Sequence, residues 1–165
     1  MIVVLMGVSG SGKTTVGRAL ANQLGWPFAD ADDYHPEANK AKMHAGIPLT
    51  DADRQPWLEA LRTLVDGTCR EGKSLVLACS ALRHEYQHYL KHNSANIRLV
   101  FLEGSEELIS RRLAARRGHF MNPALLHSQF ETLEPPAHAV KVDVTPLPDR
   151  IAEEIRQKLG LENRT

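Results

Sequence analysis

The fold is decided by the stretch Ile2-Val3-Val4-Leu5-Met6-Gly7-Val8-Ser9-Gly10-Ser11-Gly12-Lys13-Thr14, close to the start of the chain. Its first five residues are apolar and rich in β-branched side chains, which is typical of a buried central strand of a parallel sheet. From Thr14 to Leu24 the apolar residues recur at helical spacing, and Gly25 stands where a left-handed C-cap is expected. The stretch therefore predicts a strand, a glycine-rich turn and a helix in succession.

The turn in this stretch matches the pattern GxxxxGK[ST], and it lies between strand and helix as that pattern requires. Glycines let successive backbone N–H groups point toward an anion, and the helix N-terminus adds the positive end of its dipole. We expect Lys13 to reach the β- and γ-phosphates of ATP, and the Thr14 hydroxyl to ligate Mg²⁺. The residues predicted to bind the nucleotide are Gly7, Val8, Ser9, Gly10, Ser11, Gly12, Lys13, Thr14 and Thr15.

The rest of the chain alternates between strand and helix patterns. Pro56 is expected at the start of one helix and Ser105 just before another, and the last helix is expected to end at Gly160. Strands that alternate with helices predict an α/β fold, with a mainly parallel sheet covered on both faces. The further apolar runs that predict strands are 27–30, 74–79, 97–102 and 139–144.

Two stretches, 35–53 and 116–136, have a less regular pattern. In an α/β domain such excursions usually carry ligand contacts or a lid. We therefore predict a substrate-binding region at about 35–60 and a lid at about 112–136, both within one domain.

The composition excludes several classes of protein. The 165 residues are about the length of one domain. Because 20 Lys and Arg balance 20 Asp and Glu, the chain has no excess of positive charge that would favour binding to nucleic acid or an anionic membrane. Cys69 and Cys79 lack metal-binding spacing, and the apolar N-terminus lacks the basic region and cleavage site of a signal peptide. We expect one cytoplasmic domain (1–165) with reduced thiols and with no nucleic-acid or membrane partner.

Two aspartates could supply the carboxylates of a phosphoryl-transfer site. A GTPase is excluded because its base-reading pattern NKxD is absent: the nearest string, Asn39-Lys40-Ala41-Lys42, lacks the Asp. A motor or transport ATPase is not supported, because no predicted strand ends in a convincing Mg²⁺-binding carboxylate. Asp30-Ala31-Asp32-Asp33 instead follows the short second strand, at the edge where open α/β sheets bind ligands. We expect Asp30 to support Mg²⁺ and Asp32 to accept a proton from a substrate hydroxyl. An Asp-rich turn or helix cap is the alternative.

Basic residues follow at intervals, and arginine grips carboxylates and phosphates with two N–H groups. Arg112 and Arg116 are four residues apart on a predicted helix that leads into Gly118, as in a lid that clamps a phosphate. For any single basic residue, a solvated surface position is the alternative. The remaining candidates are Lys42, Arg54, Arg83, Arg111 and Arg117.

The string His84-Glu85-Tyr86-Gln87-His88 matches HExxH, in which two histidines bind zinc and the glutamate acts as a base. The longer metalloprotease pattern needs Gly at 91 and His at 94, whereas the chain has Lys91 and Ser94. His92 only continues the same helical row. We interpret the string as a solvated helix face, with a zinc peptidase as the alternative.

Several longer strings together resemble the gluconokinase family of bacterial P-loop gluconate kinases. The most specific are PLxDxDRxPWL, CSAL, and GHFM followed by SQFExLE. The matching stretches are MGVSGSGKT (6–14), DADDYHP (30–36), KMHAGIPLTDADRQPWLEAL (42–61), CSALR (79–83), RGHFM (117–121) and SQFETLEPP (128–136).

This resemblance implies that ATP, with Mg²⁺, phosphorylates the 6-hydroxyl of D-gluconate to give 6-phosphogluconate and ADP. It also implies a homodimer and a three-layer fold like that of nucleoside-monophosphate kinases, with a five-stranded parallel sheet of order 2-3-1-4-5. The alternatives are another small-molecule kinase of this fold, acting on shikimate or a nucleotide, and a non-catalytic ATP-binding regulator.

The resemblance also assigns roles to residues. By similarity to the related shikimate kinases, Asp32 would stand next to the hydroxyl that is phosphorylated, and Arg54 near the substrate carboxylate. The expected catalytic residues are Lys13, Asp32 and Arg116, with Arg112 as a further nucleotide contact. The residues whose contact with the sugar stays open are His35, Lys42, Arg83 and Gln129.

Overall fold

The computed structural model describes residues 1–92, 94–116 and 123–161. Its sheet is parallel throughout, in the order β2-β3-β1-β4-β5, which confirms the topology that the family resemblance implies. At its centre, Val4 of β1 lies between Leu77 of β3 and Leu99 of β4. The strands are β1 (Ile2–Met6), β2 (Phe28–Asp30), β3 (Leu75–Ala78), β4 (Ile97–Glu103) and β5 (Val140–Asp143).

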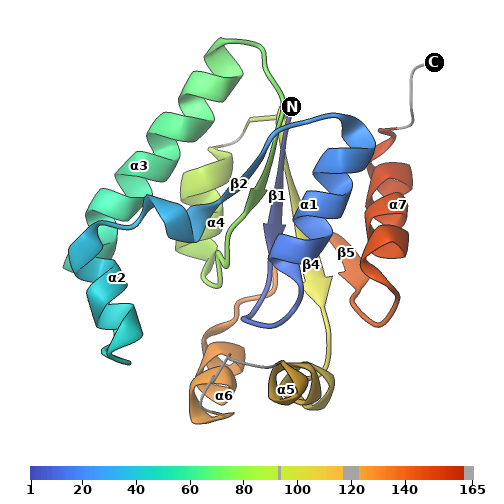
Figure 1. Cartoon of the computed structure of the whole chain (residues 1–165). Helices are drawn as coiled ribbons and strands as arrows, with labels where there is room; N and C mark the ends of the chain where they lie inside the picture. The colour runs from blue at the N-terminus through green and yellow to red at the C-terminus, as the bar shows by residue number, and fades with distance from the viewer. Residues whose placement is uncertain (93, 117–122, 162–165) are drawn as a thin grey trace.

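Helices cover both faces of this sheet (Figure 1). Helices α1 and α7 lie on one face and α3 and α4 on the other, while α5 and α6 lie beyond the carboxyl ends of the strands. The helical elements are α1 (Lys13–Leu24), the 3₁₀ turn η1 (Ala31–Tyr34), α2 (Glu37–His44), α3 (Asp51–Arg70), α4 (His84–Lys91), α5 (Glu106–Ala115), α6 (Pro123–Thr132) and α7 (Pro148–Leu159). The predicted three-layer α/β fold is therefore confirmed.

The central strand is buried because its side chains alternate between two apolar clusters. Ile2, Val4 and Met6 pack in the cluster that contains α3 and α4, and Val3 and Leu5 pack in the cluster that contains α1 and α7. All five side chains are fully buried. This explains the continuous apolar run, since a strand covered on both faces has no polar side.

The start of α3 differs from the prediction. Pro56 is inside the helix, which begins five residues earlier at Asp51. Thr50 caps it: the Thr50 Oγ1 atom accepts a hydrogen bond from the Asp53 N–H, and an Asp53 carboxylate oxygen accepts one from the Thr50 N–H. This reciprocal capping box satisfies two backbone donors, and it sets the helix start more strongly than the proline does.

The two stretches with a less regular pattern contain more structure than expected. Helix α2 and the start of α3 lie within 35–53, and α6 lies within 116–136. Both α2 and α6 are short helices with weak apolar periodicity, so the helical pattern is hard to detect in the sequence.

Two glycines inside helices provide a matched test of this packing. A Cβ atom at Gly17 of α1 would lie 2.5 Å from Cε2 of Phe28 and 3.3 Å from Cδ1 of Leu5, whereas one at Gly67 of α3 would meet no atom of the described residues within 4 Å. Gly67→Ala should raise the free energy of unfolding by about 0.5–1 kcal/mol, since alanine favours helix. Gly17→Ala should lower it by about 1–3 kcal/mol through overpacking.

Urea unfolding of both variants measures the difference. Equal stabilisation by the two substitutions would contradict the tight contact between α1 and Phe28, the first residue of β2.

Candidate active site

The phosphate loop follows β1 directly, and its shape depends on glycine. Gly10 and Gly12 have φ angles of +77° and +96°, in the left-handed region that other residues rarely adopt. A Cβ atom at Gly10 would also lie 2.7 Å from Cγ of Leu113 on α5. The loop therefore needs glycine at both positions for its turn, and at Gly10 also for the close approach of α5.

Lys13 is the first residue of α1, and its side chain folds over the loop. The ammonium donates hydrogen bonds to the carbonyl oxygens of Gly7, at 3.0 Å, and Val8, at 2.9 Å. Removal from water lowers the pKa of Lys13, while the carboxylates of Asp32 and Asp30 raise it. The predicted phosphate-binding lysine thus lies at the loop beside two acidic groups.

The two predicted carboxylates meet the phosphate loop where β2 ends. The Thr14 hydroxyl donates to Oδ2 of Asp30 at 2.9 Å, and Oδ1 of Asp30 accepts the N–H of Asp32 at 3.0 Å. A hydroxyl and a carboxylate are hard oxygen donors, which suit Mg²⁺ when phosphate oxygens complete its coordination. The donor set of Thr14 and Asp30 therefore fits the predicted metal.

Asp32 has the properties of a general base. Partial removal from water raises its pKa above the ordinary aspartate value, the neighbouring Asp30 carboxylate raises it further, and Lys13 opposes both effects. A carboxyl group with a raised pKa holds a proton more readily than a free aspartate does. Asp32 is thus suited to take a proton from a hydroxyl bound beside the phosphate loop.

These groups line a cleft of about 700 Å³ at the carboxyl ends of the strands. Asp30, Asp32 and Arg116 all line it, so the structure brings these sequence-predicted residues together. Lys40 and His44 of α2 also line it, and sequence reasoning missed both. Their spacing of four residues puts them on one helix face, and this signal was hidden because 35–53 gave no clear helical pattern.

His35, another candidate substrate residue, is held in a network of contacts with Trp57 and Asn39. His35 is buried and stacks on Trp57, with ring centroids 4.5 Å apart, and its Nδ1 lies 3.2 Å from Nδ2 of Asn39. Burial lowers the pKa of His35, which favours the neutral ring. The side chain of Asn39 also donates to the carbonyl oxygen of Asp53 at 2.7 Å. This network joins η1, α2 and α3.

Lys42 and Arg54 form ion pairs at the edge of that network. Lys42 lies 2.8 Å from Asp53, whose pKa is lowered to about 2, first by the hydrogen bond from Lys42 and then by that from the Thr50 N–H. Arg54 lies 3.0 Å from Asp51 and donates to the Tyr86 hydroxyl at 3.3 Å. Both cations are therefore held by neighbouring side chains.

The remaining predicted residues lie in different places. Arg83 is exposed and precedes α4, while Arg112 donates to the carbonyl oxygen of Thr145, at 3.2 Å, on the loop between β5 and α7. Gln129 of α6 bonds to Ser9 of the phosphate loop. Arg117 and the rest of the RGHFM string lie outside the described residues.

The HExxH string lies on α4, and its buried face is carried by other residues. His84, His88 and Glu85 are exposed, whereas Gln87 and Leu90 are buried. Among residues 1–92, 94–116 and 123–161, no group of three or more His, Cys, Asp or Glu side chains gathers closely enough to hold a metal ion. The geometry therefore gives no support to a zinc site on α4.

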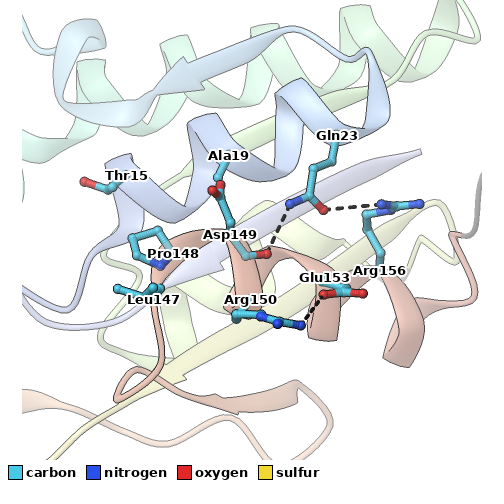
Figure 2. A pocket seen from close by; sticks show the side chains of 9 residues that line it. All are labelled: Thr15, Ala19, Gln23, Leu147, Pro148, Asp149, Arg150, Glu153 and Arg156. Carbon is cyan, nitrogen blue, oxygen red and sulfur yellow. Dashed lines mark hydrogen bonds and ion pairs between the residues drawn. The ribbon is translucent and has the colours of Figure 1, made fainter.

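A second hollow, of about 710 Å³, lies between α1 and α7 (Figure 2). Gln23 of α1 donates to the carbonyl oxygen of Asp149 at 3.1 Å and accepts from Arg156 at 3.3 Å. At the other end of the hollow lie Thr15, which follows the phosphate loop, and Leu147, which is 75% exposed. The polar contacts tie the two helices together, and Thr15 places one end of the hollow beside the phosphate loop.

Comparison with known proteins agrees with this geometry. The model of an AAA domain family matches residues 2–136. A probable gluconokinase of Xenopus tropicalis is 45% identical over 98% of this chain and 96% of its own. The gluconokinase of Gluconobacter oxydans (strain 621H) is 43% identical over 98% of this chain and 92% of its own. The crystal structure of a gluconokinase from Sinorhizobium meliloti 1021 aligns with a TM-score of 0.86, at 42% identity, over 96% of this chain and 91% of that one.

These similarities extend over nearly the whole chain, and the phosphate loop and the paired aspartates line one cleft. The chain therefore belongs to the gluconokinase family.

Proposed function

We propose that this protein transfers the γ-phosphoryl group of ATP to the 6-hydroxyl of D-gluconate, giving 6-phosphogluconate and ADP. The observation that carries the proposal is the convergence of Lys13, the Thr14–Asp30 pair and Asp32 on one cleft. The named gluconokinases that this chain resembles support the choice of gluconate.

The phosphate loop and Lys13 would bind and orient the β- and γ-phosphates. The first N–H groups of α1 have no partner within the helix, so they are available to phosphate oxygens. Lys13 would exchange its bonds to the Gly7 and Val8 carbonyls for bonds to phosphate. Bound Mg²⁺, held through Thr14 and Asp30, supplies positive charge that offsets the charge of the phosphates.

Asp32 would act as the general base. The 6-hydroxyl oxygen forms a bond to the γ-phosphorus while the bond to the β–γ bridging oxygen breaks, and ADP leaves with the electron pair of that bond. The hydroxyl proton passes to the Asp32 carboxylate. Most of the catalysis would come from positioning and charge stabilisation, since phosphoryl transfer needs little covalent help from the protein.

The lid and the substrate region would complete the site. Arg116 lines the cleft and would stabilise the transferring group, and closure of about 112–136 would exclude water so that ATP is not simply hydrolysed. Arg112, which donates to the carbonyl oxygen of Thr145, would be a further nucleotide contact. In the region of about 35–60, the ion-paired cations Lys42 and Arg54 could be drawn to the carboxylate of the substrate.

We also propose that the protein works as a homodimer, as the family resemblance implies, and that it is cytoplasmic, as expected from the absence of signal-peptide features at its N-terminus. Both cysteines are free, and burial raises the pKa of Cys79 to about 12, so this thiol does not act as a nucleophile. None of the helices in the described part of the chain has the length and apolar character needed to cross a bilayer.

The first test is ADP release from Mg²⁺-ATP with D-gluconate, compared with no acceptor, shikimate and a panel of nucleoside monophosphates. We expect a rate that depends on gluconate, and Lys13→Ala should abolish it because the loop loses its only side-chain cation aimed at the phosphates. A rate with another acceptor would assign a different substrate to the same fold. ATP binding without any acceptor-dependent release would instead indicate a regulator.

The second test addresses the base. Asp32→Asn should lower kcat by about 10²-fold or more, because the amide does not accept the hydroxyl proton. Glu85→Gln is the matched control: this exposed carboxylate is the base of the alternative zinc-peptidase interpretation, and its loss should leave turnover unchanged. Turnover of folded Asp32→Asn within about threefold of the parent would remove Asp32 from this role.

The pH profile checks the same assignment. The base must be deprotonated, so kcat/KM should fall as the pH falls through the pKa of Asp32. Because removal from water and the Asp30 carboxylate raise that pKa in the protein without nucleotide, the acidic limb of kcat/KM for Mg²⁺-ATP should lie above the ordinary aspartate value of about 3.9. A profile without an acidic limb in this region would contradict the assignment.

A further inference from the structure

The side chain of Gln129 is bonded twice to one residue of the phosphate loop. Its Oε1 atom accepts the backbone N–H of Ser9 at 2.8 Å, and its Nε2 atom donates to the Ser9 Oγ at 3.1 Å. A backbone N–H can only donate, so the amide oxygen must face it, and the amide nitrogen then faces the hydroxyl. The two residues are 120 positions apart in the chain, which makes this a long-range link between α6 and the loop.

Apolar packing supports this link. Val8 of the phosphate loop, Ile109 of α5 and Leu126 of α6 form a small buried cluster, and Leu113 of α5 packs against the tip of the loop at Gly10. Helices α5 and α6 therefore form a base on which the phosphate loop rests (Figure 1). Helix α6 and the C-terminal end of α5 fall within 112–136, the range expected to act as a lid.

The chain beyond α6 is anchored to a second loop of the site. The N–H of Glu134 donates to the carbonyl oxygen of Leu82 at 2.7 Å, and its carboxylate accepts the N–H of His84 at 3.1 Å. Buried Gln87 donates to the carbonyl oxygens of Ala81, at 3.0 Å, and Glu134, at 2.9 Å. Ala81 has a φ angle of +42°, an unfavourable conformation for alanine that these bonds help to hold.

The segment 128–134 thus joins two walls of the cleft, the phosphate loop and the loop 79–83 after β3. We propose that Gln129 is a positioning residue of the phosphate loop: it fixes Ser9, and through Ser9 the arm of the loop that leads to Gly10. This inference deepens the proposed kinase function and rests on it. It replaces the role of Gln129 as a sugar contact with a role in nucleotide binding.

The geometry separates these two roles. Both polar atoms of the Gln129 side chain are engaged by Ser9, and among the described residues that line the cleft Ser9 is present whereas Gln129 is not. A loop held in its binding shape needs less ordering when the nucleotide arrives. Loss of the link should therefore weaken nucleotide binding, with no direct effect on gluconate.

Calorimetric titration of the full chain with Mg²⁺-ADP tests the proposal without any acceptor. Gln129→Met keeps the length of the side chain and removes both hydrogen bonds, and we expect ADP affinity to fall about fivefold or more. Gln129→Asn keeps the amide but is too short to reach Ser9, and it should weaken binding in the same direction. Gln157→Met, an exposed change on α7 away from the cleft, is the matched control and should bind ADP like the parent.

A double-mutant cycle and steady-state kinetics distinguish this role from general loosening of the fold. Ser9→Ala removes one of the two bonds, so the effect of Gln129→Met should be smaller in that background than in the parent. In turnover assays KM for ATP should rise while KM for gluconate stays unchanged.

Three results would overturn the proposal. The first is an ADP affinity within twofold of the parent in both folded Gln129 variants. The second is a double variant whose loss of ADP affinity equals the product of the losses in Ser9→Ala and Gln129→Met. The third is a rise in KM for gluconate with no change in KM for ATP. If the parent shows no gluconate-dependent turnover, the proposed function fails, and the ADP titration still decides the role of Gln129.

Discussion

The active-site geometry depends first on the burial of β1. Its five side chains are excluded from water on both faces of the sheet, so the strand has one register and its carboxyl end has one position. The phosphate loop begins at that end, and Asp30 ends β2 on the same edge of the same parallel sheet. Parallel strands bring these carboxyl ends together, and this places the Thr14–Asp30 contact although the two residues belong to different elements.

The second constraint is local charge. The chain carries no net charge, so the field that holds a nucleotide must come from groups gathered at the cleft. Lys13 faces Asp30 and Asp32, and partial removal from water lowers the pKa of the lysine and raises that of Asp32. A cation and the two carboxylates proposed to bind the metal and to accept the proton thus occur within one small site, and phosphoryl transfer to a hydroxyl uses such a combination.

The sequence predicts those parts of the molecule that a clear local pattern of residues determines. The apolar run of β1 and the alternation of strand and helix patterns predict the parallel sheet, and the family resemblance supplies its strand order. The glycines of the phosphate loop and the position of Asp30 and Asp32 after the second strand predict a phosphate site at the carboxyl edge of that sheet. Three-dimensional contacts could not be predicted in the same way. The cleft-facing position of Lys40 depends on a short helix with weak periodicity, and the bond between Gln129 and Ser9 joins residues with no local relation in sequence.

The central claim is that Asp32 stands beside the hydroxyl that receives the phosphoryl group. A crystal structure with Mg²⁺, a non-hydrolysable ATP analogue and D-gluconate tests it most directly. The account predicts the 6-hydroxyl oxygen within hydrogen-bond reach of an Asp32 carboxylate oxygen, at about 2.6–3.2 Å, and in line with the γ-phosphorus. Gluconate bound with that hydroxyl directed away from Asp32, or with another side chain in its place, would contradict the account.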